Sequence, residues 1–293
     1  MFKARFLAYL SSEKNYSKRT VDSYFRDLKQ FEGFLGGKEN EDNLLKTDQD
    51  DVRSWIIQLM NDGCKATTVN RKLSSLRSFF HYLLKIEAIS KDPTALINGP
   101  KKRKPLPVFM KESQMDLLLS QKKEGLTFEE SRDFLIIEMF YLTGMRLAEL
   151  ISLRVQDVDF SRMLLKVHGK RNKERLIPFG KELEQSMKNY LELRKQQSVD
   201  SSTCFFVRTN GDPLYPSLVY RIVRRELAKV TTQTKRSPHV LRHTFATAML
   251  NNDAELSVVK EILGHSSLTA TEVYTHTTFE ELKKVYKQAH PRA

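Results

Sequence analysis

Apolar residues in the first third of the chain recur every three or four positions, the spacing of amphipathic helices. One such segment follows Ser17, a favourable N-cap residue, a second runs from about Asp48 to Gly63, and a third begins near Thr67. The apolar positions of the first and third segments are Val21, Tyr24, Phe25, Leu28, Phe31 and Leu35, and Val69, Leu73, Leu76, Phe80 and Leu83. The pattern predicts a small all-helical bundle over residues 1–97.

Residues 98–107 differ from this pattern, since NGPKKRKPLP holds three prolines, one glycine and four consecutive basic residues. Such composition predicts a linker between two domains. The basic run is Lys101, Lys102, Arg103 and Lys104. It has the composition of a nuclear-localisation patch, but in a linker between two domains contact with phosphates is the simpler explanation.

A second domain, residues 108–293, begins with a strongly apolar helix over 128–143. The helix ends at Gly144, which places Arg146 at a helix break where its side chain can point into a site. Short strands are predicted at 163–168 and 175–179 around a lysine-rich hairpin tip, and a further strand at 204–207 precedes an Asn-Gly turn. Ser217 is expected to cap a basic helix. The whole pattern predicts a mainly α protein with a small β-sheet or hairpin.

Charge and cysteine content narrow the function classes. Of 293 residues, 49 are Lys or Arg and 36 are Asp or Glu, a formal net charge of +13 that favours nucleic acid over membrane as partner. No apolar run is long enough to cross a membrane, and the first ten residues are too mixed for a signal peptide. Cys64 and Cys204 form no ligand cluster, which argues against structural zinc or another metal site and for a reducing compartment. We therefore expect a cytoplasmic protein.

The candidate chemistry is concentrated in residues 237–276. His239 and Arg242 are three apart, so they share a helix face if Pro238 opens the helix. Gly264 follows an apolar run as a helix-ending glycine would, and His265 comes directly after it. Tyr274 lies in a short segment that Thr269 or Thr271 is suited to cap. Each feature alone is common on ordinary helices.

Together these groups suit phosphoryl transfer. A guanidinium binds two phosphate oxygens and keeps its charge, and an imidazole moves protons near neutral pH. A phenol is a nucleophile once it is activated. The pattern therefore indicates chemistry at a phosphate.

The motifs TGMRLAEL, GKRNKERLIPF, HVLRHTFAT, LGHSSLTATEVYTH and AHPRA resemble those of the tyrosine recombinase (phage integrase) family, and most of all the bacterial Xer recombinases. The resemblance covers nearly the whole chain. It implies an all-helical, SAM-like core-binding domain that binds DNA, the basic linker, and an α+β tyrosine recombinase catalytic domain.

The resemblance also implies the roles of the site residues. Tyr274 is the nucleophile that forms a 3′-phosphotyrosine. Arg146 and Arg242 bind the non-bridging phosphate oxygens. His239 and His265 hydrogen-bond the phosphate and assist with the tyrosine proton. No cofactor is needed, because the phosphotyrosine conserves the bond energy.

Lys170 is implied as the acid that protonates the leaving 5′-oxygen. Arg171 departs from the glycine common in relatives at this position, which leaves Lys173 as an alternative acid. His243 and His276 are expected to pack or to contact phosphate.

Double-stranded DNA is the expected partner, bound by a tetramer on two DNA sites that is formed with self or with a second recombinase, and an FtsK-like translocase is a further partner. Basic residues of the third helix suit a duplex groove, although a solvated helix face is the common alternative; they are Arg71, Lys72 and Arg77.

The expected function is resolution of chromosome dimers at a dif-like site during cell division. An integrase or resolvase of a mobile element is the main alternative. A type IB topoisomerase and a DNA-binding protein without catalysis fit less well, since the spacing is Xer-like and the six site residues are all present.

Apolar positions of the tail recur at helical spacing, at Phe279, Leu282, Val285 and Tyr286. A helix packed on its own domain and a helix that docks into a neighbouring recombinase both fit this pattern.

Overall fold

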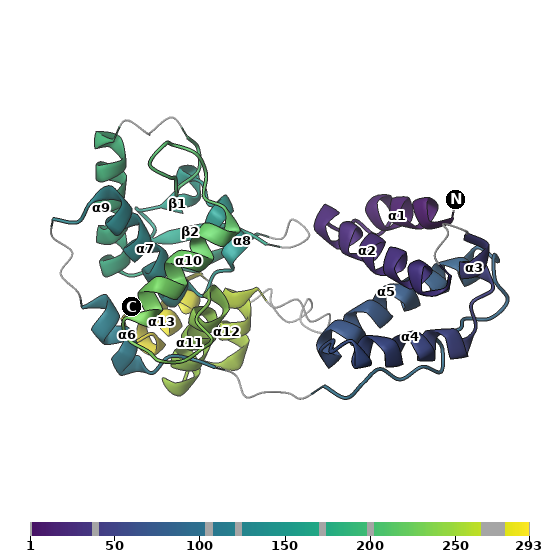
Figure 1. The fold of residues 1–293 in the computed structure, drawn as a ribbon. Coiled ribbons are helices and arrows are strands. Elements are labelled where there is room, and N and C mark those ends of the chain that lie inside the picture. The colour runs from purple at the N-terminus through teal and green to yellow at the C-terminus, as the bar shows by residue number, and fades with distance from the viewer. Residues whose placement is uncertain are drawn as a thin grey trace. The chain divides into compact units, whose positions relative to one another are not determined.

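The computed structural model describes residues 2–36, 41–102, 108–120, 125–169, 174–197, 202–264 and 279–292. The chain divides into two compact units, Met1–Pro105 and Leu106–Ala293, which we call unit 1 and unit 2 (Figure 1). Unit 1 is helical in its described residues, and unit 2 combines helices with one small sheet. This confirms the predicted fold class.

Unit 1 contains the helices predicted from the apolar spacing. Ser17 caps α2 by accepting from the backbone N–H of Thr20, and Asp48 caps α4 in a reciprocal capping box with Asp51. The helices are α1 (Phe2–Ser12), α2 (Lys18–Phe34), α3 (Glu41–Leu45), α4 (Gln49–Asn61) and α5 (Ala66–Lys85). Their apolar faces meet in an aromatic core in which Phe31 packs edge-on against Trp55 and Phe80.

A buried carboxylate joins α2 to α5. The side chain of Asp27 is 2% exposed and accepts from Arg71, from Lys72 at 3.2 Å and from the hydroxyl of Ser75 at 2.8 Å. The terminal nitrogens of Arg71 reach both oxygens of the carboxylate. A charge removed from water needs such partners, so this cluster fixes how the two helices pack.

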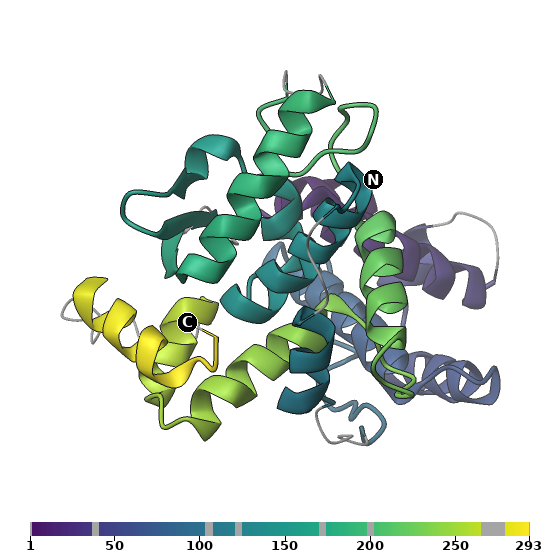
Figure 2. The same cartoon turned by 90° about the vertical axis from the view of Figure 1, so that its left-hand side faces the viewer.

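Unit 2 is built around α7 (Phe128–Thr143), a helix buried on nearly all sides, as expected of an apolar helix without a polar face. Helices α9, α10 and α11 pack against it (Figure 2). The remaining elements are α6 (Glu112–Leu119), α8 (Leu147–Ser152), the 3-10 turn η1 (Val155–Asp157), α9 (Lys181–Gln196), α10 (Pro216–Ala228), α11 (Pro238–Asn251), α12 (Leu256–Leu263) and α13 (Phe279–Ala289).

The sheet of unit 2 has the order β1-β2-β3 and is antiparallel throughout: β1 (Val158–Asp159), β2 (Leu164–His168) and β3 (Glu174–Pro178). His168 pairs with Glu174, so the last pair of the ladder closes directly before the hairpin tip. Both predicted strands of the hairpin are confirmed, with each beginning and ending within one residue of the prediction.

Two local predictions were wrong. Residues 204–207 make isolated bridges, Arg154 to Cys204 and Val207 to Pro213, and no continuous strand. The apolar run there serves core packing instead, since Phe205 and Phe206 are fully buried. Ser217 does not cap α10, because Pro216 already occupies the first helical turn and Tyr215 is the N-cap residue.

The tail forms α13, which packs on its own unit, beside α11 (Figure 2). Tyr286 is buried and donates its hydroxyl proton to the carbonyl oxygen of Leu142 at 3.0 Å. Directly after the helix, His290 stacks between the rings of Tyr286 and Phe245. Of the two interpretations of the tail, the free chain therefore shows the packed helix.

No helix in the described part of the chain is long and apolar enough to span a membrane.

Replacement of Asp27 should destabilise unit 1. Asp27→Ala removes the buried acceptor shared by Arg71, Lys72 and the hydroxyl of Ser75, at a cost on the order of 2 kcal/mol. Trp55 is the only tryptophan and is buried in unit 1, so its fluorescence during urea unfolding reports this unit. Arg53→Ala, which breaks an exposed pair with Asp50, is the control and should change little. Equal midpoints for the two variants would contradict a stabilising role for Asp27.

Replacement of Gly144 should destabilise unit 2 more than replacement of Gly125. Both glycines have left-handed backbones, with φ of +60° and +72°, where an alanine costs about 1–2 kcal/mol. A Cβ at Gly144 would also lie 2.5 Å from the ring of Phe245 and 2.8 Å from Leu263, which adds roughly 1–3 kcal/mol of overpacking. Thermal melts followed by circular dichroism should give a clearly lower Tm for Gly144→Ala than for Gly125→Ala. A Tm drop of the same size in both variants would mean that the Gly144 turn tolerates a side chain.

Candidate active site

The structure describes three of the six predicted site residues: Arg146, His239 and Arg242. Pro238 opens α11 as predicted, with His239 exposed and Arg242 buried one turn later. The other three, Lys170, His265 and Tyr274, lie outside the described residues, as do the alternative acid Lys173 and His276.

Arg146 is held at the junction of α7 and α8. It is the N-cap residue of α8, and its backbone N–H donates to Oε2 of Glu149 at 2.7 Å. The guanidinium donates to Oε1 of the same carboxylate at 2.8 Å and to the carbonyl oxygen of Gly264 at 2.8 Å. Its side chain is 36% exposed, so it remains accessible to a ligand.

Arg242 contacts two helix ends. Its terminal nitrogens donate to the carbonyl oxygens of Gly144 at 2.6 Å and Leu263 at 2.7 Å. Gly144 ends α7 and Gly264 ends α12, both in the left-handed conformation that favours glycine. Among the described residues, Arg242 has no carboxylate partner, although its residue is only 9% exposed. A buried guanidinium paired with neutral carbonyls keeps a charge that an anion can neutralise.

Two further residues of this cluster, Glu149 and Arg175, were not predicted. Arg175 on β3 donates from both terminal nitrogens to the two oxygens of Glu149, each at 2.8 Å, and from Nε to the carbonyl oxygen of Ile262 at 2.6 Å. Glu149 follows Arg146 by three residues, so the capping-box spacing was a signal that could have identified it. The pairing with Arg175 joins residues 26 positions apart and leaves no such local signal.

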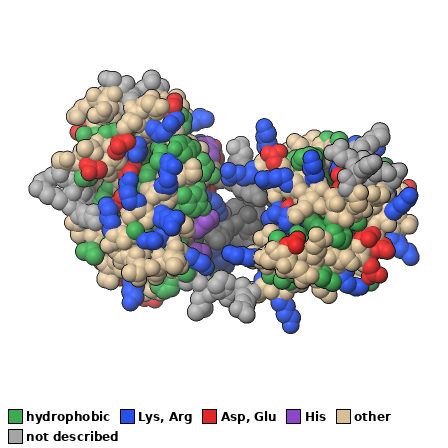
Figure 3. All heavy atoms as spheres, viewed as in Figure 1, with side chains coloured by type: hydrophobic (Ala, Val, Ile, Leu, Met, Phe, Trp, Pro, Cys, Tyr) green, Lys and Arg blue, Asp and Glu red, His purple; other side chains and the backbone are tan. Residues whose placement is uncertain are grey.

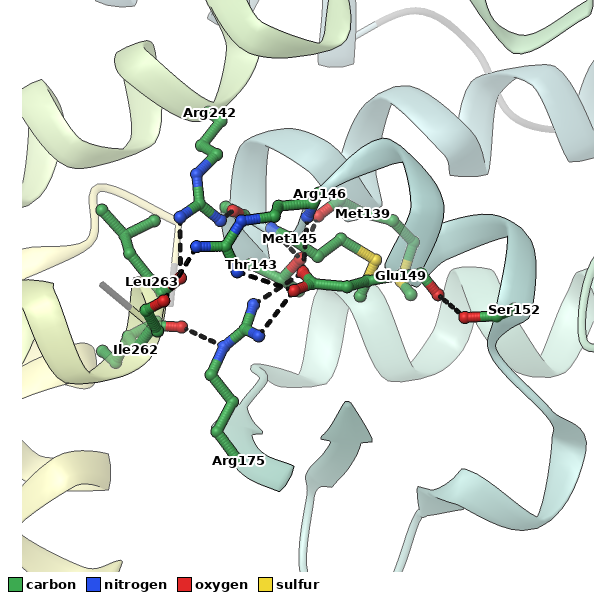
Figure 4. Close-up of polar contacts among 12 residues, drawn as sticks. Met139, Thr143, Met145, Arg146, Glu149, Ser152, Arg175, Arg242, Ile262 and Leu263 are labelled. Carbon is green, nitrogen blue, oxygen red and sulfur yellow. Dashed lines mark hydrogen bonds and ion pairs between the residues drawn. The ribbon is translucent and has the colours of Figure 1, made fainter. Parts of the chain in front are cut away.

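The C-terminal end of α12 is the common acceptor of the three arginines (Figure 4). Three consecutive carbonyl oxygens, of Ile262, Leu263 and Gly264, each accept from a different guanidinium. Carbonyls at the end of a helix lack intrahelical partners and carry the negative end of the helix dipole. The arginines satisfy these groups, and the helix end in turn fixes where the arginines lie.

The cluster carries more positive than negative charge, since its described residues include three guanidiniums and one carboxylate, that of Glu149. Burial raises the pKa of this carboxyl, but the hydrogen bonds and charge of Arg175 and the hydrogen bonds of Arg146 outweigh burial and lower it to about 2. Burial and the neighbouring charges of Arg146 and Arg175 lower the pKa of Arg242 to about 10. Arg242 and Glu149 are thus both charged at neutral pH. The surplus charge and the remaining N–H donors suit a phosphate.

The predicted DNA-binding arginines and lysine of α5 are engaged within unit 1. Arg71 and Lys72 bind Asp27, and Arg77 donates to the carbonyl oxygen of Ile97. The side chain of Arg71 is still 48% exposed, whereas that of Lys72 is 12% exposed. Arg77 is exposed as well, and contact of these three residues with DNA stays a prediction.

Two lysines of the predicted linker are also exposed. Lys101 and Lys102 are exposed, whereas Arg103 and Lys104 lie outside the described residues. Asn70 of α5 donates to the carbonyl oxygen of Pro100 at 2.8 Å, so the chain directly before these lysines is bound to unit 1. Figure 3 shows Lys and Arg side chains on the visible faces of both units.

The Glu149 cluster should make unit 2 sensitive to acid. The carboxyl has an ordinary pKa of 4.5 and a folded value of about 2, so its contribution is complete above pH 4.5 and is lost as the pH falls toward 2. The loss is on the order of 3 kcal/mol. Glu149→Gln should therefore be much less stable than the unaltered chain at pH 6, and the difference should shrink at pH 3. Urea unfolding followed by circular dichroism measures both differences.

The contribution of His290 to the stability of unit 2 is lost over a different pH range. Burial lowers its pKa from 6.5 to about 4, so its contribution declines as the pH falls from 6.5 to 4. This loss is common to both proteins and cancels in the comparison. A difference between them that stays constant with pH would contradict the role given to Glu149.

Comparison with known proteins identifies the family. The Phage integrase family profile matches residues 108–281, and that of the Phage integrase, N-terminal SAM-like domain matches residues 4–86. Tyrosine recombinase XerC of Chlorobaculum tepidum is 37% identical over 314 residues, covering 98% of this chain and 94% of the relative. Tyrosine recombinase XerC of Listeria innocua is 38% identical over 298 residues, covering 99% and 97%.

Solved structures share the fold. XerH site-specific recombinase in a post-cleavage complex with a palindromic difH substrate has a TM-score of 0.73 at 22% identity, covering 96% of this chain and 83% of that one. The Tn1549 transposon integrase in complex with circular intermediate DNA has a TM-score of 0.69 at 21% identity, covering 97% and 98%. With both domain profiles matched and relatives aligned over nearly the whole length, the chain belongs to the phage integrase family, the tyrosine recombinases that cut and rejoin DNA.

Proposed function

We propose that this enzyme is an Xer-type site-specific recombinase that resolves chromosome dimers at a dif-like site during cell division. The proposal rests on the cluster of Arg146 and Arg242 at the end of α12. The positive charges of this cluster outnumber the one negative charge, that of Glu149. The XerC relatives and the XerH complex with difH favour a dif-like substrate.

In this mechanism the phenolic oxygen of Tyr274 attacks a DNA phosphate, and a phosphorus–oxygen bond forms as the bond to the 5′-oxygen breaks. Arg146 and Arg242 stabilise the charge that develops on the non-bridging oxygens. His239 and His265 hydrogen-bond the phosphate, and one of the two accepts the phenolic proton. Lys170 protonates the leaving 5′-oxygen, with Lys173 as the alternative. Attack by a second 5′-hydroxyl then rejoins the strand and releases the tyrosine.

Burial argues against the other tyrosine of the tail as the nucleophile. Tyr286 is 1% exposed, its hydroxyl is bound to the carbonyl oxygen of Leu142, and burial raises its pKa above the ordinary value of 10. A phenol that is inaccessible and hard to ionise is a poor nucleophile. Within the C-terminal segment this leaves Tyr274.

The proposed assembly is a tetramer on two duplex sites, formed by this chain alone or with a second recombinase and activated by an FtsK-like translocase. The net charge of +13 supports binding to the DNA backbone. In unit 2, Arg221 and Arg224 are exposed on α10, and the Arg221 guanidinium contacts the ring of Tyr215. Lys101 and Lys102 contribute from the linker.

A covalent trapping experiment tests the chemistry. On a nicked suicide substrate the unaltered chain should form a protein–DNA adduct that peptide mass spectrometry maps to Tyr274, and Tyr274→Phe should bind this DNA but form none. Arg146→Ala should lose about two to three orders of magnitude in cleavage rate. Tyr220→Phe, which removes an exposed hydroxyl from α10, is the control and should form the adduct. Binding by the unaltered chain without an adduct would instead indicate a DNA-binding protein without catalysis.

Sequencing DNA trapped covalently in cells tests the biological role. One chromosomal site shared by all copies of the chromosome supports dimer resolution. Junctions of an element that changes position would instead assign the enzyme to a mobile element, the class represented by the Tn1549 integrase.

A further inference from the structure

We propose that Arg175 is a positioning residue for DNA cleavage, which sets the orientation of Arg146 and of the end of α12 without itself binding the phosphate. This inference rests on the proposed function. It assigns a role to a residue that is not one of the six predicted site residues. Arg175 belongs to β3, which follows the predicted general acid Lys170 in the sequence.

The contacts of Arg175 form a closed ring of hydrogen bonds (Figure 4). Arg175 binds Glu149, Glu149 binds Arg146, and Arg146 binds the carbonyl oxygen of Gly264. The ring closes because Nε of Arg175 binds the carbonyl oxygen of Ile262, two residues before Gly264. Three segments, β3, α8 and α12, are thus joined by the guanidiniums of Arg175 and Arg146.

Packing tightens this junction. A Cβ placed on Gly264 would lie 3.1 Å from Cδ of Arg175, so the stem of the arginine lies against the glycine backbone. Gly264 has φ of +63°, which also favours glycine. The turn that leads from α12 toward His265 is therefore shaped by contact with Arg175 as well as by its own backbone conformation.

Burial distinguishes Arg175 from the residues proposed to bind phosphate. All three of its side-chain nitrogens donate to protein acceptors, and its side chain is 11% exposed, compared with 36% for Arg146. Arg175 is thus suited to act through its neighbours.

Loss of Arg175 has a specific consequence. The carboxylate of Glu149, whose side chain is 3% exposed, would keep Arg146 as its only basic partner among the described residues. Since a buried carboxylate needs compensation, it would hold Arg146 more tightly and compete with the phosphate for that guanidinium. The end of α12 would also lose the donor to Ile262. Both effects misplace groups that act in the transition state.

Lysine cannot substitute for this residue. A guanidinium gives a planar fork to a carboxylate and a separate Nε–H, whereas an ammonium is a compact charge that cannot make these three bonds at once. Arg175→Lys keeps the charge and the apolar stem but loses the geometry, so it separates positioning from simple electrostatics.

The test measures adduct formation in a single turnover at saturating enzyme, together with DNA affinity by gel shift, for Arg175→Lys and Arg175→Gln. The control is Arg162→Gln, which changes an arginine that is 77% exposed in the turn before β2. We expect near-normal affinity and a cleavage rate reduced about 10- to 100-fold for both Arg175 variants, the usual cost of losing a group that orients a functional residue. Arg162→Gln should cleave normally.

A substrate with sulfur at the scissile 5′-bridging position shows which step is affected. A thiolate leaves without a proton, so sulfur should rescue Lys170→Ala. It should not rescue the Arg175 variants if their defect lies in Arg146 and α12. In a Glu149→Gln background, Arg175→Gln should cost less than it does alone, because residues that act through each other are not additive.

Several results would overturn the inference. These are a normal cleavage rate for Arg175→Lys, rescue of the Arg175 variants by sulfur, and full additivity with Glu149→Gln. A rate loss that disappears at temperatures well below the Tm of each variant would assign Arg175 to stability alone. Absence of an adduct with the unaltered chain would refute the proposed function itself. This outcome differs from a failure of the Arg175 inference, in which the unaltered chain still forms the adduct.

Discussion

The carbonyls at the C-terminal end of α12 have no hydrogen-bond partners within the helix. Their need for donors is the constraint on which the candidate site depends. A helix end removed from water must find donors, and here each of three successive carbonyls takes one from a different arginine. The arginines come from the start of α8, from α11 and from β3. Hydrogen bonds to one helix end therefore hold three other elements in place. The arginines proposed to bind the phosphate are thus also groups that the fold requires, and this arginine cluster forms whenever unit 2 folds.

The helix ends in this arrangement can be predicted from the sequence. Gly144 and Gly264 follow apolar runs and end helices in the left-handed conformation, which places Arg146 at a helix start as expected. These features depend on residues within one or two helical turns. The bonds of Arg175 to Glu149 and Ile262 join positions 26 and 87 residues apart, and no periodicity within one segment encodes them. The same limit explains the error at residues 204–207, where an apolar run fits a strand and a loop packed into the core equally well.

For charge, too, the sequence provides one part of the information and the structure the other. The excess of basic residues points to a polyanion, yet it does not say which of them are free to bind one. On α5, Arg71 and Lys72 compensate the buried Asp27, and Arg77 binds a backbone carbonyl. A count of lysines and arginines therefore overestimates the groups available to DNA, because part of the charge balances carboxylates inside the bundle. Only the structure separates the two uses.

The anchoring of α13 by Tyr286 and His290 limits how far the proposed nucleophile can move. Tyr274 is ten residues after Gly264 and five before Phe279, and both flanking elements belong to unit 2. At a maximum of about 3.5 Å per residue, a segment of five residues spans at most roughly 18 Å. A side chain on a segment tethered at both ends samples a small volume, which raises its effective concentration within that volume. Release of α13 would remove one tether, lower that concentration and widen the region that Tyr274 can reach.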